Sequence, residues 1–300
     1  MDMAQNKCCR HGASLRRRRR RRRKILRSII FSCSIIAVAV FVAVGSRMIT
    51  SGDGGTNKYD VEAGNNTYDN AVIENSKISE KNKIQNNQSM LDDIMNSTQY
   101  PKQLKDLALK NEEALEFVYD YPAEHVKEHT IDLTEEASMD SVPLFVQWDK
   151  RWGYEKYSGN FFAASGCGPT TLSMVVVYLT HNRDASPLAV AKYSKEAGYS
   201  VDGSGSSWTL ISEGCRHYGI KAKTVALDES RMKAELDAGH PIVINVGPGD
   251  FTDTGHFMVI TGYDDEGFSI NDPNSIEKSG KRWLFKNISS QIRAVWSMYV

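Results

Sequence analysis

SGCGPTTLSMV, residues 165–175, places a cysteine between two glycines at the start of an apolar helical pattern that continues to Leu179. Pro169 is compatible with the first turn of a helix. We therefore expect Cys167 at a helix N-terminus, where unpaired backbone N–H groups and the helix dipole stabilise a thiolate. Its own N–H would point toward a developing oxyanion, and its small neighbours would leave room for a carbonyl group. An inert, buried cysteine in a Gly-rich turn explains this segment equally well.

Helices are predicted around this segment, and strands are predicted after them. Apolar spacing predicts helices over 171–179, 187–197, 207–218 and 229–238. Short β-rich stretches between turns predict strands over 241–246, 256–263, 267–271 and 281–285. Helices first and an antiparallel set of strands afterwards is an α+β order. The sequence therefore predicts an α+β domain whose sheet lies C-terminal to the candidate nucleophile.

A thiolate nucleophile needs a base, and His256 is the best-placed histidine to provide one. It opens the apolar stretch Phe257–Ile260 directly after a glycine. Asp272 follows the next predicted strand, and a hairpin brings strand ends together, so we expect this carboxylate to reach His256 and hold its tautomer. Both residues also fit plain structural roles, as a strand-end histidine and a turn-initiating Asn-Asp-Pro. The chain order Cys, His, Asp favours a triad, and His240 ranks below His256 as the base.

Two further residues complete the candidate chemistry. Gln147 lies ahead of Cys167 among few other side-chain amides, so it is a candidate oxyanion donor, with surface solvation as the plain alternative. Cys215 falls inside a predicted helix and is expected to be packed rather than reactive. A Cys167–Cys215 disulfide would be chemically allowed outside the cell, but the two contexts argue against it. Cysteine usage matches neither a metal cluster nor a disulfide scaffold, and the sequence predicts no cofactor and no metal site.

Several stretches of the chain together carry a family resemblance. They are PLFVQWDKRWGY (143–154), SGCGPTTLSMV (165–175), TGHFMVITGYDDEG (254–267) and NDPNS (271–275). This combination resembles the stand-alone relatives of the bacteriocin-processing, double-glycine leader peptidases, which are papain-like. The resemblance covers about residues 142–290, and FVYDYP (117–122) is similar to a segment found ahead of such domains.

The resemblance implies a papain-like cysteine proteinase fold, with the nucleophile at a helix start and an antiparallel sheet after the helices. It implies Cys167 as nucleophile, His256 as general base, Asp272 as orienting acid and Gln147 as oxyanion donor. The substrate would be a peptide or protein, with cell-wall peptide as one candidate. Unlike the transporter-linked members, this chain contains no Walker motif. Cleavage of double-glycine leaders therefore does not carry over.

The leading functional prediction is hydrolysis of peptide or amide bonds through a Cys-His-Asp triad. Two other enzyme functions suit the same fold, namely a cell-wall amidase or endopeptidase and a transglutaminase-like acyl transferase. A further class is a catalytically silent module that presents an aromatic cleft to a wall or peptide ligand. The presence of all three triad residue types argues against the silent module, which has no need of them.

The N-terminal region predicts a membrane anchor. The chain has no net charge, but residues 1–47 hold thirteen Lys or Arg and one acid, so the remainder is acidic. SIIFSCSIIAVAVFVAVGS (28–46) contains no charged residue, and as a helix it would span ~28 Å, close to the ~30 Å hydrocarbon core. Arg16–Arg23 precede it, and such residues stay on the cytoplasmic side. We therefore predict a single-pass membrane protein with a cytoplasmic N-terminus and an extracytoplasmic catalytic domain.

Two alternatives to the anchor remain open. The apolar run also fits a signal peptide cut near Ala43–Gly45, which would make the protein secreted. The arginine run also fits a nucleic-acid-binding arm. Beside a membrane span, a topology signal and attraction to anionic lipid are favoured. We therefore predict no nucleic-acid partner.

The chain is thus divided into consecutive segments. They are a basic cytoplasmic arm (1–27), a transmembrane anchor (28–46), a flexible linker (47–100), a helical lead-in (101–141) and the papain-like domain (142–300). The linker is rich in Asn, Ser, Lys, Gly and Asp with sparse apolar residues, and helical spacing covers 101–121 of the lead-in. Whether the lead-in braces the domain or covers its cleft like a propeptide is left open, as is the oligomeric state.

Overall fold

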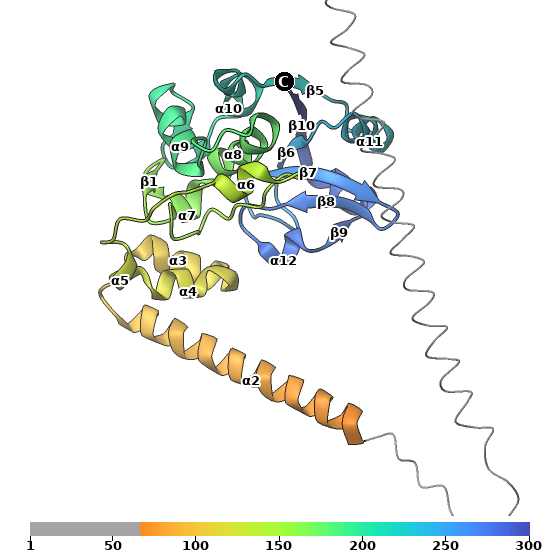
Figure 1. The fold of residues 1–300 in the computed structure, drawn as a ribbon. Coiled ribbons are helices and arrows are strands. Elements are labelled where there is room, and N and C mark those ends of the chain that lie inside the picture. The colour runs from red at the N-terminus through yellow and green to blue at the C-terminus, as the bar shows by residue number, and fades with distance from the viewer. Residues whose placement is uncertain (1–66) are drawn as a thin grey trace, which may run out of the picture. The chain divides into compact units, whose positions relative to one another are not determined.

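The computed structural model describes residues 67–300 (Figure 1). The predicted arm (1–27), the predicted anchor (28–46) and the first part of the predicted linker lie outside the described residues. Within 67–300, no helix combines the length and apolar character needed to cross a membrane. The anchor therefore stays a prediction from sequence.

A six-stranded antiparallel sheet forms the C-terminal part of the fold (Figure 1). Its strands in spatial order are β5 (Lys221–Thr224), β10 (Ile292–Tyr299), β6 (Ile242–Val246), β7 (His256–Asp264), β8 (Gly267–Asn271) and β9 (Arg282–Trp283). The predicted strands that became β6, β7 and β8 are confirmed. The sequence analysis did not predict β5 and β10, although β10 pairs with both β5 and β6.

Helix α8 (Cys167–Thr180) packs against β7 on one face of the sheet. Strand residues alternate between two cores, as the period of two in a strand requires. Val243, Phe257 and Val259 belong to the core that contains the buried side chains of α8. Ile244, Met258 and Ile260 belong to a second core, which includes Met232 of α11 (Glu229–Asp237). Each fully buried Val, Ile or Met contributes roughly 1.5–3 kcal/mol, so the sheet is held from both faces.

Shorter elements connect these layers. Helix α9 (Pro187–Glu196) confirms the predicted 187–197 helix, and Ser186 caps it by accepting a hydrogen bond from the Ala189 N–H. The other short elements are α6 (Thr134–Ser138), α7 (Phe162–Ser165), α12 (Ile276–Ser279), α13 (Phe285–Ile288), η3 (Ser289–Gln291), and the hairpins β1 (Lys156–Tyr157) with β2 (Asn160–Phe161) and β3 (Ser200–Val201) with β4 (Gly205–Ser206).

Two predicted elements differ in the structure. The single helix predicted over 207–218 is divided into α10 (Thr209–Ser212) and the 3-10 helix η2 (Gly214–Tyr218). The break falls at Glu213, which has a non-helical backbone conformation. At Gly214, the next residue, a Cβ would lie 3.0 Å from the Tyr199 ring, so the chain lies close against that ring. The strand predicted over 281–285 is only β9, because the chain turns into α13.

The C-terminal part of the segment predicted as a flexible linker over 47–100 is helical. Residues 67–96 form helix α2 (Thr67–Asn96), which is polar along most of its length. Ile94 near its end is fully buried in a cluster with residues of the lead-in. This tertiary packing stabilises a helix that the polar composition did not predict.

The predicted lead-in helix over 101–121 is interrupted. It comprises α3 (Lys102–Lys110), the 3-10 turn η1 (Glu112–Ala114), α4 (Leu115–Tyr119) and α5 (Tyr121–Glu124). Asn111 adopts an extended backbone between α3 and η1, and its side chain accepts a hydrogen bond from the Glu113 N–H. This local side-chain bond competes with helix continuation, which explains the break.

Candidate active site

Cys167 is the first residue of α8, as the sequence predicted. Gly166 occupies the N-cap position, and the first backbone N–H groups of a helix lack partners within it. The thiol is partly exposed at a cleft of about 700 Å³. The helix start therefore presents a nucleophile to solvent-accessible space.

The glycines on either side of Cys167 are required by packing. A Cβ on Gly166 would lie 2.5 Å from the Phe162 ring, and a Cβ on Gly168 would lie 2.5 Å from Oγ of Ser206. The sequence analysis expected both glycines to leave room for substrate. The structure instead shows that they let the helix start lie close against α7 and β4.

His256 and Asp272 meet as the hairpin argument predicted. His256 begins β7, Asp272 directly follows β8, and these two strands are paired. Nε2 of His256 lies 2.7 Å from Oδ1 of Asp272, and both side chains are buried. With Nε2 engaged by the carboxylate, the other ring nitrogen is the one available to a thiol.

The electrostatics of Cys167 and His256 are coupled. Burial disfavours the Cys167 thiolate, but hydrogen bonding and the charge of His256, with help from the Phe257 and Gly168 backbone, hold its pKa below that of an ordinary thiol. Burial likewise disfavours the His256 imidazolium, but the Asp272 carboxylate and the Cys167 thiolate raise its pKa well above the usual histidine value. The arrangement favours a thiolate–imidazolium pair, the reactive form of a cysteine nucleophile.

Asp272 belongs to a tightly hydrogen-bonded segment, which we call the acid turn (272–275). Oδ1 of Asp272 also accepts the Asn274 N–H at 2.8 Å, and the Ser275 N–H donates to the Asp272 carbonyl. Oδ2 of Asp272 is buried and has no hydrogen-bond partner among the described residues. The turn therefore fixes one carboxylate oxygen against His256.

Gln147 lies beside the acid turn. Its Nε2 donates to the Ala163 carbonyl at 2.7 Å and to Oδ1 of Asn274 at 3.3 Å, and its backbone N–H donates to the Pro273 carbonyl. The structure thus links Gln147 both to the acid turn and to the segment before Cys167. Its role as oxyanion donor stays a prediction.

Cys215 lies in a different environment. It is fully buried in η2, and burial raises the pKa of its thiol to about 11. Both described cysteines are free thiols, so the disulfide considered from sequence is not formed. The expectation that Cys215 is packed is confirmed.

The cleft beside Cys167 is mainly polar and rich in glycine. Its walls come from the β1–β2 and β3–β4 hairpins, from the loop after β6 and from the start of β7. Trp208, 47% exposed, lies on this cleft and contacts Trp296 edge to face. Trp208 was not among the site residues predicted from the sequence.

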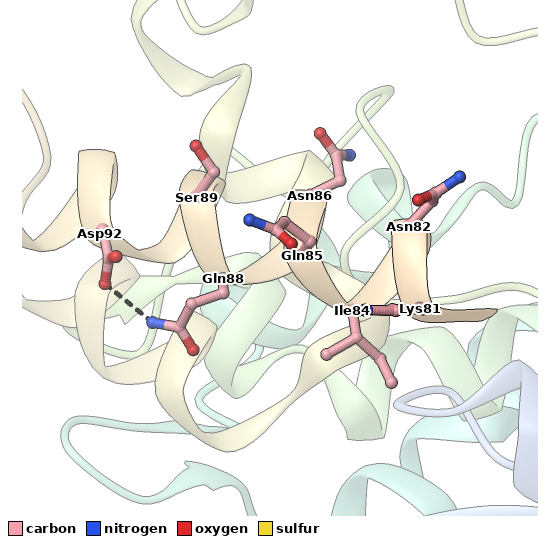
Figure 2. Close-up of a pocket in the computed structure, with 8 residues that line it drawn as sticks. All are labelled: Lys81, Asn82, Ile84, Gln85, Asn86, Gln88, Ser89 and Asp92. Atoms are coloured by element: carbon pink, nitrogen blue, oxygen red, sulfur yellow. Dashed lines mark hydrogen bonds between the residues drawn. The ribbon is translucent and has the colours of Figure 1, made fainter. Parts of the chain in front are cut away.

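Figure 2 shows a second hollow, along α2, lined by residues from Lys81 to Asp92. All its lining residues come from one helix, and none is a cysteine or a histidine. Among residues 67–300, no group of three or more His, Cys, Asp or Glu could hold a metal ion. The α2 hollow therefore offers no thiol and no imidazole, and the Cys167 cleft is the candidate active site.

Residues that contact the acid turn in space but lie far from it in the sequence were not predicted. Asn274 was part of a quoted motif but was given no role, and Asn111 and Glu113 were not noticed. Asn111 donates to the Asn274 carbonyl at 2.9 Å, across 163 residues of sequence. A polar residue in an amphipathic lead-in carries no local signal for such a contact.

Comparisons with known proteins give this chain a family. The model of the Peptidase_C39 like family matches residues 139–300. Among solved structures, the peptidase domain of Streptococcus ComA, a bi-functional ABC transporter of a quorum-sensing pathway, is 19% identical, with a TM-score of 0.39 over 53% of this chain and 96% of that one. A protein assigned as a C39-like peptidase from Bacillus anthracis is 18% identical, with a TM-score of 0.34 over 53% of this chain and 95% of that one.

No curated protein matches the sequence of this chain. The family match covers more than half of the 300 residues and includes Cys167, His256 and Asp272. The chain belongs to the Peptidase_C39 like family and is a cysteine peptidase of papain-like type.

Proposed function

We propose that this protein hydrolyses peptide or amide bonds with Cys167 as nucleophile, His256 as general base and acid, and Asp272 as the residue that orients His256. The observation that carries the proposal is the placement of His256 between a thiol of lowered pKa and a buried carboxylate 2.7 Å from Nε2. This arrangement supplies the three roles that covalent acyl transfer needs.

The reaction proceeds in two halves. The Cys167 thiolate attacks the substrate carbonyl, and the imidazolium of His256 gives its proton to the leaving amine as the C–N bond breaks. The product of this half is a thioester on Cys167. His256, now neutral, takes a proton from water, the hydroxide oxygen attacks the thioester, and the acid product leaves as the thiolate–imidazolium pair re-forms.

The tetrahedral intermediates need hydrogen-bond donors for their oxyanion. The Cys167 N–H at the start of α8 is one candidate, and Gln147 is the other. If Gln147 donates in the transition state, Gln147→Ala lowers kcat by roughly 10²-fold with little change in KM. If Gln147→Ala instead raises KM and leaves kcat unchanged, the role of Gln147 is to hold Asn274 in place.

The test of the proposed reaction uses a mixed peptide library incubated with the full chain in H₂¹⁸O. Hydrolysis through an acyl-enzyme places one ¹⁸O in each new C-terminal carboxylate, and Cys167→Ser is the control that should give no product. Incorporation of an added primary amine in place of ¹⁸O would favour the acyl transferase. Release of muropeptides from purified cell wall, with no library cleavage, would favour the wall amidase. If none of these substrates is turned over, the catalytically silent binding module would be favoured.

We also propose that residues 28–46 anchor the chain and that the catalytic domain lies outside the cytoplasm. The support is the charge-free run of 19 residues after an arginine-rich arm. In bacterial cells expressing the full chain, the protein should remain in membranes washed with alkaline carbonate, and added protease should digest a C-terminal tag on spheroplasts. A soluble product that begins near Gly45 would establish the secreted alternative.

A further inference from the structure

The lead-in contacts the acid turn through a single carboxylate. Glu113, in η1, accepts a hydrogen bond from the Ser275 hydroxyl, one from the Ile276 N–H at 2.7 Å and one from the Glu277 N–H at 3.1 Å. These donors lie 162 to 164 residues further along the chain. One side chain thus accepts hydrogen bonds from Ser275, the last residue of the acid turn, and from the first two backbone N–H groups of α12.

A second lead-in side chain holds the middle of the turn. Nδ2 of Asn111 donates to the carbonyl and to Oδ1 of Asn274, at 2.9 and 3.1 Å. The Asn274 N–H is the group that donates to Oδ1 of Asp272, the oxygen that holds His256. Asn111 and Ser275 are both buried, so these bonds are shielded from competing water.

Residues 101–138 of the lead-in lie ahead of the region that the family model matches, which begins at residue 139. The lead-in elements α3, η1 and α4 share a core with Phe161 and Ala163, which lie just before Cys167. The lead-in therefore packs against the segment that carries the nucleophile and hydrogen-bonds to the turn that carries the acid. It lines the Cys167 cleft at a single residue, Gln103, so it does not cover that cleft.

We propose that Glu113 is a positioning residue that clamps the acid turn, so that the lead-in is a built-in brace of the catalytic triad rather than a propeptide. The catalytic consequence rests on the function proposed above. Loss of the clamp lets Asp272 move from His256, which destabilises the imidazolium and, through it, the Cys167 thiolate. Cys167 and Asp272 are the titratable groups that face His256. A displacement of Asp272 therefore changes the ionisation of His256 first and that of Cys167 through it.

The test compares Glu113→Gln with Glu116→Gln in the full chain. Glu116 is a matched control, because it is an exposed carboxylate of the same segment with no hydrogen bond to the acid turn. The readout is the rate of Cys167 alkylation by iodoacetamide across pH. We expect Glu113→Gln to slow alkylation at pH 6 roughly tenfold. The pH profile of peptide hydrolysis should become narrower, because its acid limb shifts to higher pH and its alkaline limb shifts to lower pH.

Two further measurements keep the outcome decisive. In an Asp272→Asn background, Glu113→Gln should have no additional effect, since residues that act through one another are not additive. Backbone amide exchange at Ile276 and Glu277 should accelerate in Glu113→Gln and recover partly in Glu113→Asp, and this readout needs no reactive thiol. Unchanged exchange, or equal alkylation in Glu113→Gln and Glu116→Gln, would overturn the brace. Slow alkylation of Cys167 in the unaltered chain, with exchange behaving as expected, would overturn only the proposed function.

An independent observation concerns the charge of the cleft. Arg293 is the only charged residue among the described residues that line it. Nη1 of Arg293 donates to the Ser290 carbonyl at 2.9 Å, and no ion pair within residues 67–300 includes this side chain. A Cβ on Gly247, also in the cleft, would lie 2.8 Å from Nε, so glycine lets the guanidinium lie directly on the backbone.

The geometry points to Arg293 as the recognition site for a carboxylate of the peptide substrate. Arg293 is exposed, so its guanidinium is accessible to a ligand. A guanidinium binds carboxylates in a bidentate manner, and the described lining of the cleft provides no acidic side chain to compete. This inference names the substrate class of the proposed peptidase, namely peptides with an acidic group near the scissile bond.

The test uses two probes that differ by one charge, iodoacetate and iodoacetamide, on the full chain. The ratio of the iodoacetate rate to the iodoacetamide rate at Cys167 should fall about fivefold in Arg293→Gln. In Arg293→Lys the ratio should stay near that of the unaltered chain. At ~1 M salt the ratio of the unaltered chain should fall toward that of Arg293→Gln. Arg231→Gln removes an exposed arginine outside the cleft and is the control. An unchanged ratio in Arg293→Gln would overturn the carboxylate site, while the iodoacetamide rate alone reports on the nucleophile.

Discussion

The two free cysteines of the described chain stand in opposite environments. Cys167 opens α8 beside a cleft, and His256 lowers the pKa of its thiol. Cys215 is enclosed in η2, where burial raises its thiol pKa to about 11. Both thiols carry a desolvation cost. At Cys167 the hydrogen bond and charge of His256 outweigh that cost, whereas at Cys215 the charge of Arg216 and backbone hydrogen bonds do not. The difference between the two thiol pKa values follows from the imidazole of His256 beside Cys167 rather than from exposure alone.

The largest expected effect separates the two thiols by substitution. Cys167→Ala should lower peptide hydrolysis by roughly 10⁴-fold or more, because the covalent route is lost. Cys215→Ala should leave kcat/KM within about twofold and cost roughly 1 kcal/mol of stability for the small cavity. Hydrolysis rates and urea denaturation measure the two outcomes. Equal losses of activity would contradict the distinction between the cysteines.

The next effect tests the partner of Cys167. His256→Ala removes the hydrogen bond and charge that lower the Cys167 pKa, so alkylation by iodoacetamide at pH 6 should slow by roughly 10²-fold. The rate at Cys215 should not change in the same sample, which makes it the internal control. Mass spectrometry of the labelled peptides measures both rates together. Undiminished labelling of Cys167 would show that its reactivity has another source.

The raised pKa of Cys215 predicts a loss of stability at alkaline pH. An unfolded thiol ionises near pH 8.5–9, while the folded Cys215 stays protonated until about pH 11. The unfolded state therefore binds fewer protons in this window, and stability falls as pH rises through it. The stability of the unaltered chain relative to Cys215→Ala should fall by about 2–3 kcal/mol between pH 8 and 11, so that the variant becomes the more stable protein at the upper end. Denaturant titrations of both proteins at each pH give the difference, and a constant difference would refute it.

The smallest effect compares the glycines beside the two cysteines. Gly168→Ala places a Cβ 2.5 Å from Oγ of Ser206, and Gly214→Ala places one 3.0 Å from the Tyr199 ring. Each overpacked site should lose roughly 1–3 kcal/mol in thermal or chemical unfolding. Only Gly168→Ala should also lower Cys167 alkylation, because it displaces the start of α8. Adding Ser206→Gly should restore the rate, and failure to do so would place the strain elsewhere.

Much of the fold could be predicted from local patterns. Helix α8, helix α9 and strands β6 to β8 follow from apolar periodicity and turn residues, and the β7–β8 hairpin placed Asp272 beside His256. Strands β5 and β10 were missed, because their pairing joins segments about seventy residues apart and depends on burial in the finished sheet. Helix α2 was missed because its composition is polar, and among its described side chains the buried one, Ile94, packs against lead-in residues that are distant in sequence.

The sequence by itself determined the chemical groups, their order and the start of the nucleophile helix, because glycine, proline and apolar spacing act within a few residues. Tertiary structure decided which thiol is acidic, which carboxylate orients the histidine and which lead-in residues hold that carboxylate in place. The reason is that pKa values and buried hydrogen bonds depend on distances and on exclusion of water. Glu113 reaches the acid turn across 162 residues, and no local pattern encodes such a distance.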